Sequence, residues 1–219
     1  TGAPLEITRL RSTVTLDGRS DESAWKDIEP LPMVMQLPSF GAEPSERTEV
    51  LLAYDDEYFY LAARCYDHEP EGVQATTMKR DDEAENSDCL GLILDTFNDN
   101  ENAVTFVTTP TGSRIDKTIY GDMIQSGGAA ASWDAFWEVE TVITDRGWCV
   151  EMRIPFSSLR FQEQDGRVTM GCTVYRWIAR KDERVIFPAI PQHWGTRSHL
   201  KPSRSRDIVL TGIHGGNPL

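Results

Sequence analysis

The chain has 219 residues, of which 35 are acidic and 22 are basic, and its formal net charge is −13. A hydrophobic content of 39% is near the globular average and excludes a disordered chain, while four cysteines are too few for a disulfide-stapled miniprotein. No apolar run approaches the roughly 20 residues that span a bilayer. We expect a single domain over residues 1–219, either mature or excised from a longer chain.

The charge is unevenly distributed. Residues 1–150 carry 11 Lys/Arg and 29 Asp/Glu (net −18), whereas residues 151–219 carry 11 and 6 (net +5). The acidic part repels phosphate backbones, so we expect no nucleic-acid partner. The acidic excess is typical of a solvated surface, and it does not exclude divalent cations or neutral molecules as ligands.

Alternation of apolar and polar residues with a period of two dominates the sequence. The strand candidates span residues 13–16, 48–54, 58–67, 89–95, 103–109, 115–119, 138–144, 147–155, 169–180 and 207–212. Helical turns are expected only near 21–25 and 156–159. Short strands joined by turns, without βαβ alternation, predict an all-β fold, an antiparallel β-sandwich in which the N-terminal segment and the final IVLTGI close one sheet.

Six segments occur in a specific order: LDGRSDESAW (16–25), TEVLLAYDDEYFYLAARCYD (48–67), KRDD (79–82), SDCLGLILDTFNDNENAVTF (87–106), SWDAFWEVET (132–141) and GWCVEMRIPFSSLRF (147–161). Together they resemble the family 9 carbohydrate-binding module-like domain, over about residues 12–212. The version at the N-terminus of uncharacterised bacterial outer-membrane β-barrel proteins is most similar. The resemblance implies a β-sandwich, secretion to the periplasm or outer-membrane surface, a structural calcium ion, and sugar recognition by stacked aromatic rings.

Established sugar-binding members place a tryptophan shortly before the Asp of SDCLGLILD and a glutamate three residues after it. This sequence has Glu85 and Gly91 near those positions. The two departures favour a function other than sugar binding.

Sugar recognition needs an apolar ring to cover the sugar's C–H face and polar groups to pair with its hydroxyls. Trp133 and Trp194 lie in loops with polar neighbours, where each either stacks on a ligand or folds onto the core. Trp177, in the charged strand VYRWIARK, is a further candidate for lining a face of the sheet. The remaining three tryptophans occupy apolar-periodic positions and are expected in the core: Trp25, Trp137 and Trp148.

Three charged residues lie beside predicted strand ends: Arg80, Arg114 and Asp116. They are candidates either for hydrogen bonds to a sugar or for structural ion pairs with one another.

Calcium needs several converging oxygen ligands, and the segment DDEAENSD at 81–88 is rich in them. We predict Asp81, Asp82 and Asp88 as ligands, together with Asp67 at the end of a preceding strand. The alternative is a solvated acidic loop. The glycine and terminal glutamate of an EF-hand are missing.

Catalytic signatures are absent from the sequence: it has no GxSxG, no HExxH and no phosphate-binding loop. The cysteines form no CxxC pair and read as single, small buried thiols. In an oxidising compartment Cys89 and Cys149 are the candidates for a disulfide, because alternation turns both away from the apolar faces of their strands.

The leading hypothesis is therefore a non-catalytic, calcium-stabilised domain that binds a glycan or oligosaccharide. The alternative is a periplasmic interaction or gating domain of an outer-membrane β-barrel in the same chain, with no sugar ligand.

Overall fold

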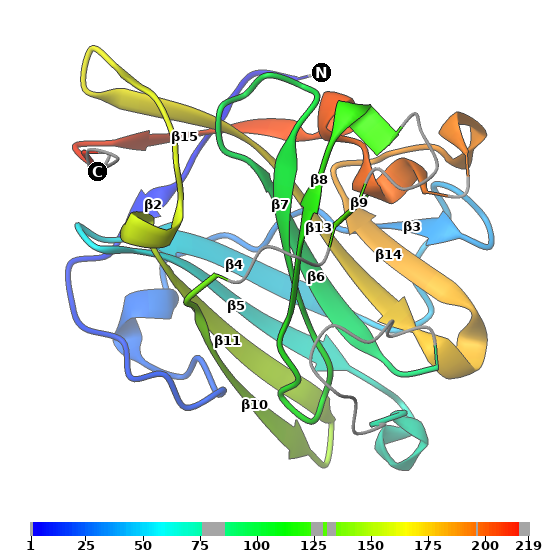
Figure 1. Cartoon of the computed structure of the whole chain (residues 1–219). Coiled ribbons are helices and arrows are strands. Elements are labelled where there is room, and N and C mark those ends of the chain that lie inside the picture. The colour runs from blue at the N-terminus through cyan, green and yellow to red at the C-terminus, as the bar shows by residue number, and fades with distance from the viewer. Residues whose placement is uncertain (1, 76–85, 124–128, 131–134, 196, 215–219) are drawn as a thin grey trace.

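The computed structural model describes residues 2–75, 86–123, 129–130, 135–195 and 197–214. The strands in these ranges form two sheets that pack against each other, with short 3-10 turns between strands (Figure 1). The predicted β-sandwich is confirmed. Among the described residues, no helix has the length and apolar character needed to cross a membrane.

The larger sheet runs in the order β1 (Leu5–Glu6), β15 (Arg206–Thr211), β13 (Arg167–Ile178), β6 (Cys89–Asp95), β7 (Ala103–Thr108), β8 (Ile115–Ile119) and β9 (Ala129–Ala130). Beside β13 lie β12 (Glu163–Gln164) and β14 (Glu183–Phe187), and β14 also pairs with β3 (Val34–Leu37). The smaller sheet runs β10 (Glu138–Thr144), β11 (Gly147–Pro155), β5 (Tyr58–Tyr66), β4 (Thr48–Tyr54) and β2 (Thr8–Arg9).

Pairing between these strands is antiparallel, apart from the parallel pairs β1–β15 and β2–β4. The pair β1–β15 confirms that the N-terminal segment and the last strand close one sheet. The short turns are η1 (Ser23–Trp25), η2 (Pro70–Gly72), η3 (Gly121–Met123), η4 (Phe156–Ser158), η5 (Ala179–Lys181), η6 (Gln192–Trp194), η7 (Ser198–Leu200) and η8 (Pro202–Arg204).

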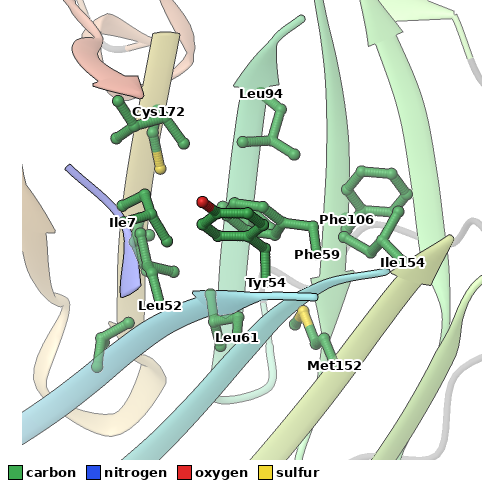
Figure 2. Packing of buried hydrophobic residues seen from close by; sticks show 14 of the residues in the cluster. Ile7, Leu52, Tyr54, Phe59, Leu61, Leu94, Phe106, Met152, Ile154 and Cys172 are labelled. Carbon is green, nitrogen blue, oxygen red and sulfur yellow. The ribbon is translucent and has the colours of Figure 1, made fainter. Parts of the chain in front are cut away.

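The main core lies between the sheets because alternate residues of each strand face inward. Figure 2 shows side chains of the smaller sheet, such as Phe59 and Met152, packed toward Leu94 and Phe106 of the larger one. All three tryptophans predicted for the core are buried: Trp137 and Trp148 between the sheets, and Trp25 on the outer side of the smaller sheet.

Several local predictions differ from the structure. Residues 13–16 form no strand, and backbone N–H groups of this region are held by carboxylates instead: Thr15 N donates to Glu22 Oε1 (2.8 Å) and Gly18 N to Glu151 Oε2 (2.9 Å). The sequence pattern also missed β3 and β14. Both are short, and β14 follows β13 after only the η5 turn, which ends at Asp182 in the left-handed region (φ 47°).

All four cysteines are free thiols. Cys89 packs on the outer face of the larger sheet, whereas Cys149 lies between the inward-facing Trp148 and Val150 and so faces outward from the smaller sheet. Alternation does turn both away from the core, but on opposite sides of the sandwich, so they do not pair.

Candidate functional site

The chain between β14 and β15, of which residues 188–195 and 197–205 are described, covers part of the outer face of the larger sheet and lies above β14 in Figure 1. We call it the 188–205 segment. Pro188, Pro191 and Pro202 lack a backbone N–H and cannot continue a strand ladder. The segment therefore folds as irregular chain and three short turns, η6 to η8.

Gln36 of β3 anchors the start of this segment. Its side chain is fully buried, and Nε2 donates to Ile190 O (2.8 Å) and Ser198 Oγ (3.2 Å). In return, Gln192 Nε2 donates to Gln36 O (2.5 Å). A buried amide with these partners fixes the backbone on both sides of η6.

Asp122 of η3 anchors the end of the segment. Its carboxylate accepts from Ser203 N (3.1 Å) and Ser203 Oγ (2.8 Å), and Lys201 Nζ donates to both its backbone oxygen (2.7 Å) and Oδ2 (3.1 Å). Ser205 then bonds across to Thr173 of β13 (2.9 Å between hydroxyl oxygens). The segment is thus held at both ends by polar contacts with other elements.

A pocket of about 320 Å³ opens against the segment. This volume lies at the lower end of the range for small-molecule sites, about 300–1,000 Å³. Its lining consists of Gly2, Pro188, Ala189, Ile190, Pro191, Trp194, Ser203, Arg204, Ser205 and Arg206. The Trp194 side chain is 42% exposed at this pocket, and the guanidinium carbon of Arg204 lies 3.6 Å from the centre of its ring. Trp194 is therefore partly exposed at the surface, and its stacking on a ligand stays a prediction.

Trp177, another candidate, packs beside the Arg184 guanidinium, whose carbon lies 5.4 Å from the centre of a Trp177 ring. Next to it on β13, the Tyr175 ring lies over Gly91, and the edge of His199 meets Tyr175 with ring centres 4.9 Å apart. Burial, together with the charges of Arg184 and Arg197, lowers the pKa of His199 well below its ordinary value. This layer is a packed support beneath the segment, and Trp177 does not line the pocket.

Asp116 and Arg114 lie elsewhere. Asp116 is buried, and its carboxylate accepts from Trp137 Nε1 (3.1 Å) and Ala135 N (2.8 Å). Arg114 Nη1 donates to Trp137 O (3.1 Å). Both residues therefore help to hold Trp137 in place, and a role for either in sugar binding stays a prediction.

The predicted metal ligands Asp67 and Asp88 lie at the end of the sandwich near β13. Both Asp67 carboxylate oxygens are paired with Arg180 (2.5 and 2.7 Å), and Arg176 Nη2 is 4.0 Å away. Asp88 is buried: Oδ1 accepts from Ala179 N (3.0 Å), and Oδ2 has no hydrogen-bond partner among the described residues. Burial raises the pKa of Asp88, which the nearby Arg176 and Arg180 charges only partly oppose.

Asp67 does not fit a calcium site in this arrangement, because both its oxygens are already paired with the Arg180 guanidinium, whereas Asp88 stays a predicted ligand. Among the described residues, no group of three or more His, Cys, Asp and Glu side chains is placed to hold a metal ion. Four predicted site residues lie outside the described residues: Arg80, Asp81, Asp82 and Trp133.

The sequence reasoning missed Gln36, Asp122 and the two pocket arginines, Arg204 and Arg206. One signal was present: residues 184–206 contain Arg184, Arg197, Lys201, Arg204 and Arg206 but no Asp or Glu. In a chain of net charge −13, such a run marks a distinct surface. Gln36 carried no sequence signal, because its role depends on contacts about 150 residues away.

The sequence matches no protein-family model and no curated protein. Solved structures are similar in fold. A family 9 carbohydrate-binding module from Caldicellulosiruptor kristjanssonii in complex with cellotriose has 16% identity and a TM-score of 0.61, over 98% of this chain and 95% of that chain. Its complex with glucose has 15% identity and a TM-score of 0.63, over 99% and 98%.

A candidate carbohydrate-binding protein from Bacteroides uniformis ATCC 8492 has 13% identity and a TM-score of 0.71, over 98% of this chain and 100% of that chain. The chain therefore has the fold of family 9 carbohydrate-binding modules, as the sequence resemblance predicted.

Proposed function

We propose that this chain is a non-catalytic carbohydrate-binding domain whose glycan or oligosaccharide ligand occupies the pocket at Trp194. The fold supports the proposal, since two neighbours of the same fold are complexes with cellotriose and glucose. The neighbours are described as binding modules or as a candidate carbohydrate-binding protein, in agreement with the expectation that the domain is not an enzyme.

The observation that carries the proposal is the half-exposed Trp194 ring at the edge of a polar pocket. Indole offers an apolar surface to the C–H face of a sugar, while hydroxyl and guanidinium groups such as Ser203 and Arg204 offer hydrogen bonds to its oxygens. The anchors at Gln36 and Asp122 fix the backbone on which these groups stand, which reduces the entropy lost on binding.

Calorimetric titration against a broad panel of oligosaccharides tests the proposal. Trp194→Ala should weaken binding by about tenfold or more, as expected for loss of an aromatic contact. Phe97→Ala is the matched control, because Phe97 is 47% exposed and lies outside the pocket. Folded protein that binds no saccharide on the panel would overturn the proposal.

One observation favours the alternative of an interaction or gating domain. At Gly91, where established sugar-binding members carry a glutamate, the space beside the backbone is filled by the Tyr175 ring. A partner barrel in the same chain would be revealed by the complete reading frame, and binding of that barrel by the folded domain, without any saccharide, would establish this alternative.

Two expectations stay predictions. Location in the periplasm or at the outer-membrane surface follows from the family resemblance, and cell fractionation tests it. A structural calcium ion would depend on Asp81, Asp82 and Asp88, since both oxygens of Asp67 are paired with Arg180, and a melting temperature that falls on chelation would support it.

A further inference from the structure

The pocket at Trp194 is cationic, although the chain as a whole is acidic. Among its lining residues are two arginines, Arg204 and Arg206, and no carboxylate side chain. They end the acid-free run 184–206 in a chain with 35 acidic residues. The local charge at the pocket is therefore opposite in sign to the net charge of −13.

Both pocket arginines lack an anionic partner. Among the residues that the structure describes, neither Arg204 nor Arg206 forms an ion pair, and the Nε of each is buried without a hydrogen-bond partner. Lys201, by contrast, is paired with Asp122. A guanidinium without an anionic partner can pair through its terminal Nη groups with a ligand that supplies acceptors.

The positions of the two guanidinium groups suit an anion. The guanidinium carbon of Arg204 lies 3.6 Å from the centre of the Trp194 ring, and the N–H donors of a guanidinium lie in its own plane. Arg206 lies against the Gly2 backbone, where a β-carbon would come within 2.1 Å of Nη1. Gly2 thus lets the N-terminal chain approach the guanidinium closely and form part of the pocket wall.

From this geometry we propose that the pocket selects an anionic saccharide, with Trp194 against the sugar ring and Arg204 and Arg206 paired with its acidic group. The proposal rests on the carbohydrate-binding function proposed above and names the class of sugar. The shared chemistry is an anionic oxygen group, which a uronate carboxylate or a sugar sulfate supplies, and a guanidinium fork can bind either with two N–H bonds.

The test compares oligouronates, sulfated oligosaccharides and neutral oligosaccharides of equal length by calorimetry. One anionic series should bind about tenfold or more tightly than the neutral series, and this preference should shrink between about 50 mM and about 500 mM NaCl. Whichever anionic series binds more tightly identifies the acidic group.

Arg206→Gln should weaken anionic binding by about tenfold and change neutral binding by less than about threefold, whereas Arg204→Gln should weaken both, because Arg204 also lies against Trp194. Arg160→Gln, an exposed arginine outside the pocket, is the control and should change neither. Melting curves verify that each variant is folded.

Equal or tighter binding of the neutral series would overturn this proposal and leave the carbohydrate-binding function standing. If none of the three oligosaccharide series binds, both the anion selectivity and the carbohydrate-binding function are overturned. Saturation by inorganic sulfate or acetate, with no saccharide bound, would also overturn it.

Discussion

The ring of Tyr175 lies so close to Gly91 that a β-carbon on Gly91 would come within 2.3 Å of Tyr175 Cε1 and 2.5 Å of Cζ. Gly91 and Tyr175 face each other in register on the neighbouring strands β6 and β13. The absence of a side chain at 91 is thus what allows a buried tyrosine to cross this part of the sheet.

Gly91→Ala should therefore destabilise the fold by about 1–3 kcal/mol, as expected when a packed layer is overfilled. Tyr175→Ala alone leaves a cavity and should also destabilise the fold. The double variant should lose less stability than the sum of the two single losses, because the added methyl group at 91 fills part of the space that the tyrosine ring vacates. Tyr175→Phe keeps the clashing ring carbons and should not reduce the cost of Gly91→Ala when the two are combined. Urea unfolding measures the stability of the wild type and of each variant. Strictly additive losses for Gly91→Ala and Tyr175→Ala would contradict the predicted clash.

The same pair shows how far the sequence could predict the site. Alternation on β6 and β13 places Gly91 and Tyr175 correctly on the outer face of a sheet. It does not indicate that the two strands are neighbours, since they are about 80 residues apart in sequence. The strands and the buried tryptophans follow from local periodicity, whereas the pocket depends on such long-range pairing and on the 188–205 segment, which has no period.

Asp67 and Arg180 form an ion pair in which the Asp67 side chain is fully buried and that of Arg180 is 15% exposed. Asp67→Asn removes the nearest counter-charge of Arg180 but leaves Glu46 Oε1 at 3.5 Å and Glu69 Oε2 at 3.9 Å, so it should cost about 1–3 kcal/mol. Asp56→Asn, in the exposed pair Arg9–Asp56, should cost less than about 1 kcal/mol. If Asp67 is an ion-pair partner, the loss of unfolding free energy in Asp67→Asn should be the same in calcium and in chelator. A loss seen only in calcium-containing buffer would show that Asp67 is a metal ligand.

The pH dependence of stability provides a separate check on Asp67. Burial pushes its pKa upward, but hydrogen bonds from Arg180 and Glu69 N and the charges of Arg180 and Arg176 outweigh burial, so the pKa lies below its ordinary value of 3.8. A depressed pKa means that the stabilisation is present above the unfolded-state pKa and is lost as pH falls through the folded-state pKa.

The difference in unfolding free energy between wild type and Asp67→Asn should therefore be constant above about pH 5 and should narrow below about pH 3.8. Denaturant unfolding at a series of pH values measures it. A difference that stays constant down to the acid unfolding transition would show that the carboxylate charge contributes nothing.

Asp122 tests whether the 188–205 segment is held in a binding-competent form. Asp122→Asn keeps a residue type that tolerates its φ of 51° but removes the charge and an acceptor oxygen used by Ser203 and Lys201. We expect saccharide affinity to fall about three- to tenfold although Asp122 does not line the pocket. Hydrogen exchange in the segment should rise in parallel. Asp145→Ala, in an exposed turn, is the control. Unchanged saccharide affinity and unchanged hydrogen exchange in Asp122→Asn would show that Asp122 is not needed to hold the segment.

The thiols provide a test of the packing that is independent of any ligand. Burial raises the pKa of Cys65, Cys89 and Cys172 to about 12, and Cys149, which is partly exposed, also has a raised pKa from burial. Because the thiolate is the reactive form, a thiol reagent should modify Cys149 first and the other three only after unfolding.

Mass spectrometry of the native protein should show one slowly modified site, which Cys149→Ser removes, and four modified sites in denaturant. This result should hold for protein purified without reductant, because Cys89 and Cys149 face away from each other on opposite sheets. Recovery of only two thiols in denaturant, with a Cys89–Cys149 cross-link in the digest, would contradict this arrangement of the two sheets.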